Sequence, residues 1–140
     1  MSPLRQPQLL AVEDYLAGER VSDVRHEYLG GVVYEMVSTR NLHNLISGNV
    51  FASLHSRLRG QKCRPYNSDT KIRIRLSNQV RFYYPDASVI CRPNPPDDAF
   101  QDDPTAVIEV LSRSTRRIDE GEKKDAYLTI PYLSLYVLVE

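Results

Sequence analysis

Two short runs that otherwise resemble buried strands each carry one carboxylate, and this pattern limits how the chain can fold. The first run, residues 84–90, contains Asp86, and the second, residues 106–111, is apolar except for Glu109. The second run is typical of a central strand buried on both faces. The first predicts a strand that is irregular or at a sheet edge near Pro85. Burying a carboxylate costs several kcal/mol unless a cation or hydrogen bonds compensate, so the fold must supply partners for Asp86 and Glu109.

Two kinds of partner fit these acids. Neighbouring strands could bring Asp86 and Glu109 close together, where their oxygens suit Mg²⁺, and the ion would polarise a phosphate and activate water. Lys123 and Lys124 open a helix after the Glu109 strand, so either lysine could reach back to orient that water. The alternative is a buried ion pair with Arg116 or Lys123. The residues alone leave both interpretations open.

The remaining patterns predict a mixed α/β protein. Apolar residues at helical spacing predict helices, and a Gly-Gly turn between two β-rich runs predicts a hairpin. The composition, 140 residues with 41% hydrophobic and 26% charged residues, fits one domain over residues 1–140. The expected elements are helices over 9–19, 41–60 and 119–130, a hairpin over 25–36, and strands over 63–66, 71–76, 80–90, 106–111 and 133–139.

Alternating cations mark one of the predicted strands. Lys71, Arg73 and Arg75 alternate with apolar residues, which predicts a half-exposed strand with a cationic face. Such a face is either simply solvated or a stripe that contacts phosphates. The balance of 18 basic and 18 acidic residues gives no support for nucleic-acid binding, although a local basic patch is compatible with it. The candidate nucleic-acid contacts are Lys71, Arg73, Arg75, Arg116 and Arg117.

Two further residues have both a structural and a functional interpretation. Glu27 lies in the first strand of the predicted hairpin, where it either faces solvent or contributes to the edge of a metal site. His43 follows Leu42 at the border of the apolar stripe of the 41–60 helix, where a histidine is either structural or catalytic. We treat Glu27 and His43 as accessory candidates.

The cysteines and the apolar segments bear on the compartment. Cys63 and Cys91 are far apart and form no Cys-x-x-Cys pattern, so we expect reduced thiols in a cytoplasmic protein. The first eight residues do not resemble a signal peptide, and no window approaches the ~20 apolar residues of a membrane helix. We therefore expect an intracellular protein with no membrane partner.

Several of these segments, taken together, closely resemble one known family. The Tyr-Pro-Asp run is followed by the Glu109 strand, a Gly-Glu-Lys segment and an apolar strand at the end of the chain. This order is similar to that of the Uma-type restriction endonuclease family in the PD-(D/E)xK nuclease superfamily, and the likeness extends upstream to most of the chain. The segments that carry it are residues 84–91, 104–115, 119–123, 127, 130–131 and 136–139, with 27–31, 35–36 and 43 upstream.

The resemblance implies a fold, a reaction and a set of site residues. The fold would be a restriction-endonuclease-like core, a mixed β-sheet flanked by helices. The reaction would be Mg²⁺- or Mn²⁺-dependent hydrolysis of DNA phosphodiester bonds, with the metal held by Asp86 and Glu109. Leu111 stands where the superfamily motif has its lysine, and the family instead keeps a lysine in the Gly-Glu-Lys segment, which makes Lys123 the catalytic candidate. Glu27 and His43 match family positions near the site.

The sequence also departs from the family pattern. Gly30-Gly31-Val32 replaces the usual Asp-Gly-Glu turn, and Arg113 stands where the family has proline. Relatives usually continue for several tens of residues beyond the position of Glu140, so we expect the carboxyl-terminal part of the family's domain to be missing. Two alternatives stay open: an inactive nuclease-fold protein that binds nucleic acid or a protein partner, and a structural or dimerisation module in which the carboxylates are only ion-paired. By analogy with nucleases that cut both strands, a homodimer would suit palindromic DNA.

Overall fold

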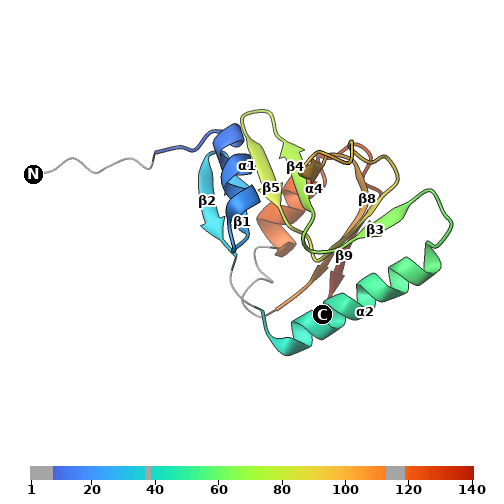
Figure 1. Ribbon diagram of the computed structural model, residues 1–140. Helices are drawn as coiled ribbons and strands as arrows, with labels where there is room; N and C mark the ends of the chain where they lie inside the picture. Colours follow the sequence, from blue (N-terminus) through green and yellow to red (C-terminus); the bar gives the residue numbers. More distant parts are fainter. Residues whose placement is uncertain (1–7, 37–38, 113–118) are drawn as a thin grey trace, which may run out of the picture.

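The computed structural model describes residues 8–36, 39–112 and 119–140. In Figure 1, α1 lies beside the β1–β2 hairpin, and α2 lies at the opposite side of the molecule. The elements in chain order are α1 (Val12–Val21), β1 (His26–Leu29), β2 (Val32–Glu35), α2 (Asn41–Arg57), β3 (Arg64–Tyr66), β4 (Lys71–Arg75), β5 (Val80–Tyr83), β6 (Ala87–Ile90), β7 (Phe100–Gln101), β8 (Pro104–Val110), the π-helical turn η1 (Asp119–Lys123), α4 (Lys124–Tyr127) and β9 (Leu135–Val139).

The described strands form two mixed sheets, which confirms the expected mixed α/β class. The first sheet has the order β2-β1-β5-β4-β7, and the second has the order β3-β6-β8-β9. Each sheet contains one parallel pair, β4 with β7 and β8 with β9, among antiparallel neighbours. The predicted hairpin is confirmed: Gly30 and Gly31, with φ of 58° and 104°, form the turn between β1 and β2. Positive φ is a conformation that glycine adopts at little cost.

The strand predicted over 80–90 is in fact two strands that belong to different sheets. β5 ends at Tyr83 in the first sheet, and β6 begins at Ala87 in the second. Pro85 lies between them, and its lack of a backbone N–H fits a break in the ladder. Asp86 therefore lies where the chain passes from one sheet to the other.

Apolar clusters on both faces of the second sheet hold the layers together. Val107 packs in a cluster with residues of the first sheet and of α4, including Ile72, Tyr83 and Tyr127. The neighbouring residue Ile108 packs in a second cluster, which residues of α2 cover. β8 is thus buried on both faces, as its sequence predicts.

The second helix is correctly predicted as an element, but its expected apolar stripe is only partly covered. Val50, Leu54 and Leu58 pack against the second sheet. Leu42 and Leu45, which the periodicity places on the same stripe, are 66% and 61% exposed. The amino-terminal turns of α2 instead border a cavity, described below.

The expectation of reduced cysteines is wrong, because Cys63 and Cys91 form a disulfide. The antiparallel pairing of β3 with β6 sets Arg64 opposite Ile90. The next residues outward are the two cysteines, whose Cα atoms are 4.0 Å apart. The sequence separation of 28 residues conceals this pairing, which depends on the register of the two strands. None of the helices in the described ranges is long and apolar enough to cross a membrane.

Candidate active site

Asp86 is held in one orientation by two groups from other elements. Its Oδ2 accepts a hydrogen bond from the backbone N–H of Val110 at 2.7 Å. His43 Nε2, from α2, lies 3.3 Å from the same oxygen, and the Asp86 side chain is 16% exposed. Among the described residues both contacts use Oδ2, so Oδ1 is left for a further ligand.

Glu109 lies beside Asp86 across the β6–β8 pair. Ala87 pairs with Ile108, so the register extended by one residue brings Asp86 opposite Glu109. The backbone N–H of Val110 donates to Asp86 Oδ2, so the Asp86 carboxylate lies next to the residue that follows Glu109. Glu109 is only 4% exposed. Two acids that are 23 positions apart in sequence are therefore neighbours at one point of the second sheet.

Lys123 belongs to the same buried region and is held by an acid from the first sheet. Its Nζ lies 2.9 Å from Glu27 Oε2 and 5.3 Å from the centre of the Tyr83 ring. Lys123 is 9% exposed, whereas the adjacent Lys124 is exposed. The Glu27 side chain is 18% exposed, so it faces inward to the lysine and not to solvent.

Tyr127 links the two acids electrostatically. Burial, followed by the charges of Glu109 and Glu27, raises the pKa of its hydroxyl well above the ordinary value. Both carboxylates thus lie near one buried ring, whose centre lies 5.5 Å from that of the tilted Tyr83 ring. The Glu27–Lys123 pair and Glu109 consequently form one polar region beneath the junction of the sheets.

The donor chemistry of this region suits a divalent cation that also binds substrate. No group of three or more His, Cys, Asp or Glu side chains in the described parts of the chain is arranged to hold a metal ion. Mg²⁺ does not require such a cage, because it keeps several waters and uses one or two carboxylates with substrate phosphates. Asp86, with one oriented carboxylate and a remaining oxygen, and Glu109 beside it fit that requirement.

A cavity of about 320 Å³ opens next to Asp86. Residues from the first turns of α2, among them His43 and Ser47, line one side of it. Arg25 and Asn67, which precede β1 and follow β3, line the other side. The cavity gives Asp86 access to a ligand of limited size.

The predicted cationic face of β4 is wrong as a continuous surface feature, because two of its three cations are buried or paired within the protein. Lys71 is 7% exposed, and its burial lowers the pKa of its ammonium group. Arg73 donates two hydrogen bonds to Asp102, at 2.7 and 2.9 Å. Arg75 alone of the three is exposed. The other two candidate nucleic-acid contacts, Arg116 and Arg117, lie outside the described residues.

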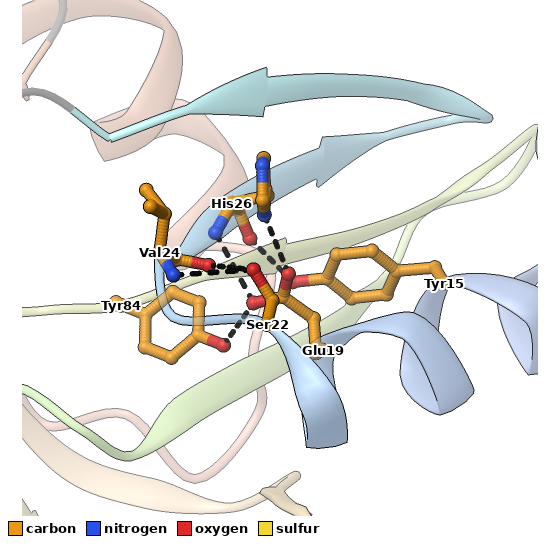
Figure 2. Close-up of polar contacts among 6 residues, drawn as sticks. All are labelled: Tyr15, Glu19, Ser22, Val24, His26 and Tyr84. Atoms are coloured by element: carbon orange, nitrogen blue, oxygen red, sulfur yellow. Dashed lines mark hydrogen bonds and ion pairs between the residues drawn. The ribbon is translucent and has the colours of Figure 1, made fainter.

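One polar network near the site has no signal in the sequence. Glu19, in the last turn of α1, has a side chain that is only 6% exposed. It accepts hydrogen bonds from the Tyr84 hydroxyl at 2.6 Å and from the backbone N–H of His26 at 3.1 Å, and its other oxygen lies 2.7 Å from His26 Nδ1 (Figure 2). The hydrogen bond to Tyr84 ties α1 to the segment that carries Asp86. An acid in the last turn of an amphipathic helix ordinarily faces solvent, so spacing could not identify Glu19.

Comparisons with known proteins agree with this architecture. The Uma2 family, described as "Putative restriction endonuclease", matches residues 12–140. Two uncharacterized proteins of Synechocystis sp. are 37% identical over 131 residues and 26% identical over 136 residues. The matches cover 93% and 95% of this chain and 68% and 76% of the relatives.

A solved structure shares the fold. It is the crystal structure of a "putative nuclease belonging to DUF820" from Anabaena variabilis, with a TM-score of 0.68 and 16% sequence identity. The alignment covers 94% of this chain and 73% of that one. The resemblance predicted from the sequence is thus confirmed, and because the family match extends over nearly the whole chain, the protein belongs to the Uma2 family.

Proposed function

We propose that this protein is a divalent-metal-dependent nuclease that hydrolyses phosphodiester bonds in DNA. The observation that carries the proposal is the β6–β8 register, in which Ala87 pairs with Ile108, the neighbours of Asp86 and Glu109, together with the cavity that Asp86 lines. The description of the family and that of the Anabaena variabilis protein support the same reaction class.

Each residue has a role that follows from its contacts. Asp86 and Glu109 would hold Mg²⁺ or Mn²⁺. When bound, the ion supplies a Lewis acid that polarises the scissile phosphate and lowers the pKa of a bound water. His43 and the Val110 N–H would orient Asp86 through Oδ2. Lys123, positioned by Glu27, would donate a hydrogen bond to the attacking water or to the charge that develops on the phosphate.

The test is cleavage of a supercoiled plasmid and of end-labelled oligonucleotides with Mg²⁺, with Mn²⁺ and with EDTA. We expect cleavage that requires the metal and that falls about 100-fold or more in Asp86→Asn and Glu109→Gln. Asp97→Asn, which removes an exposed carboxylate from a loop, is the matched control and should cleave like the wild type.

Lys123 has its own matched control in the next residue. Lys123→Met should lose cleavage, whereas Lys124→Met, on the exposed side, should retain it. Because Lys123→Met leaves Glu27 buried and unpaired, the double variant Glu27→Gln/Lys123→Met keeps the test valid if the single variant unfolds. If the wild-type protein leaves all substrates intact with both metals and still binds DNA, the proposal is wrong. The alternative of an inactive protein that binds nucleic acid would then take its place.

A further inference from the structure

The cavity beside Asp86 has a lining rich in hydrogen-bond donors. We propose that it binds one unpaired nucleotide of the substrate strand, with Arg25 as its phosphate ligand, so that the substrate is single-stranded or locally unpaired DNA. This inference rests on the proposed nuclease function and specifies its substrate class.

The size of the cavity sets the first limit. Its volume of about 320 Å³ is at the lower end of the ~300–1,000 Å³ range of small-ligand sites. One nucleotide-sized group can enter such a space, whereas a base-paired duplex cannot. Enzymes that act on a nucleotide within a pocket require a single-stranded substrate or a nucleotide rotated out of the stack. Because Asp86 forms part of the wall, the occupant would lie next to the metal-binding oxygens.

Arg25 is the cation of this cavity and is already fixed in place. Its Nη1 donates to the backbone carbonyl of Ser68, and its guanidinium lies 5.6 Å over the Tyr84 ring. A weaker ion pair joins the same nitrogen to Asp69 at 3.7 Å, and the Arg25 side chain is 41% exposed. All of these polar contacts use Nη1, so Nε and Nη2 remain as donors for a phosphate. A guanidinium fork suits the two oxygens of a phosphate group.

The uncharged groups complement a nucleotide as well. Asn44 and Asn67 each use the side-chain oxygen as an acceptor, from Thr39 and from the Asp69 N–H, which leaves their NH₂ groups as donors. Ser47 Oγ is buried and, among the described residues, has no hydrogen-bond partner. These donors match the ring nitrogens and carbonyl oxygens on the edge of a base.

An aromatic side chain completes the lining. Phe51 lies one turn further along α2 from Ser47, is half-buried, and also borders the cavity. Bases of any sequence stack on such a ring, which is how many proteins bind single strands. Hydrogen-bond donors and an aromatic ring in one cavity are the two features that a single nucleotide requires.

The cations of the predicted basic strand do not form a duplex footprint. Duplex binding depends on several phosphate contacts made by free cations. Here Arg73 is paired with Asp102, Lys71 is buried, and the whole chain has a formal net charge of zero. Recognition of one nucleotide needs only the local donors of the cavity.

The experiment measures binding separately from cleavage. Asp86→Asn protein is titrated into three fluorescein-labelled probes in EDTA: a 12-nucleotide oligothymidine, a blunt duplex, and the same duplex with a one-base bulge. Fluorescence anisotropy should show the single strand and the bulged duplex binding about tenfold tighter than the blunt duplex. Equal affinity for the blunt duplex would overturn the inference.

Variants locate the binding to the cavity. Arg25→Gln and Ser47→Leu, which respectively remove the phosphate ligand and fill the space, should each weaken single-strand binding about tenfold. Arg59→Gln removes an exposed charge beyond the carboxyl end of α2 and should bind like the parent. Single-strand binding unaffected by both cavity variants would refute the assignment. If the wild type cleaves nothing but these binding results hold, the inference stands and the catalytic proposal fails.

Discussion

Replacing Tyr84 by phenylalanine tests whether the buried Glu19 network fixes the segment that carries Asp86. The Tyr84 hydroxyl donates to Glu19 at 2.6 Å, and burial together with this carboxylate raises the pKa of Tyr84 above its ordinary value. The phenylalanine ring would keep its position under Arg25 and Lys71, which lie 5.6 and 5.4 Å from the ring centre. The substitution therefore removes the hydroxyl with its hydrogen bond to Glu19 and its contact with the Tyr15 hydroxyl, and it leaves the ring in place.

The structure sets the size of the effect. Tyr84 is 5% exposed and the Glu19 side chain 6%, so water cannot replace the lost donor. A hydrogen bond to a charged group contributes about 1.5–3 kcal/mol. His26 still supplies two contacts to Glu19, which keeps the loss near the middle of that range. We expect Tyr84→Phe to lower the free energy of unfolding by about 2 kcal/mol.

Urea denaturation followed by circular dichroism measures this change. Tyr34→Phe is the matched control: Tyr34 is 52% exposed, and its loss of a hydroxyl should change stability by less than about 0.5 kcal/mol. A double-mutant cycle with Glu19→Gln should give a coupling energy of about 1 kcal/mol. A Tyr84→Phe effect no larger than that of the control, or zero coupling, would refute the reasoning.

Two further predictions concern the disulfide and the buried lysine. Replacing Cys63 and Cys91 by serine, or reducing the disulfide, should lower the free energy of unfolding by about 3 kcal/mol, because the bridge closes a loop across a separation of 28 residues. Urea titration with and without dithiothreitol measures this change. Identical titration curves under the two conditions would contradict the prediction. Lys71→Met should raise the free energy of unfolding at pH 7 by about 1 kcal/mol, because burial disfavours the ammonium form. The lysine's penalty is present below its lowered pKa and disappears as the pH rises toward the ordinary value of 10.5, so the gain should shrink in urea titrations at pH 10.5. A methionine variant less stable than the wild type at pH 7 would show that the charge is compensated.

The parts of the fold that depend on local pattern could be predicted from the sequence. The run around Glu109 is apolar on both sides of the acid and rich in β-branched residues, and a strand of that kind is typical of a sheet that is covered on both faces. The Gly30-Gly31 pair supplies the positive φ that the β1–β2 turn requires. In both cases the physical cause lies within a few consecutive residues.

The parts that depend on strand order could not be predicted. Alternation of Lys71 and Arg73 with apolar residues is the same whether the face that carries the cations is open to solvent or covered by other parts of the fold, and here Lys71 is buried and Arg73 is paired with Asp102. The pairing of Cys63 with Cys91 likewise requires the β3–β6 register. The burial of a side chain and the pairing of two cysteines thus depend on contacts between distant segments, which a short sequence pattern does not specify.

The same limit explains which features of the candidate site were visible in the sequence. Asp86 and Glu109 were found because an acid within an apolar run is conspicuous, and Lys123 because a family resemblance distinguishes it from Lys124. Arg25 and Glu19 lie in polar stretches, where a charged residue is ordinary. The fold brings Arg25 to the cavity and over the Tyr84 ring, and it brings Glu19 to the Tyr84 hydroxyl.

Asp86 is constrained from both sides of the junction between the two sheets. On the β5 side, the chain is anchored through Tyr84 and its hydrogen bond to Glu19. On the β6 side, Val110 and His43 hold the carboxylate itself through Oδ2. A ligand whose own position is fixed by surrounding contacts loses little freedom when it binds a metal. The break between β5 and β6 therefore places the Asp86 carboxylate at the cavity, with Oδ2 held by Val110 and His43 and, among the described residues, with Oδ1 left for a further ligand.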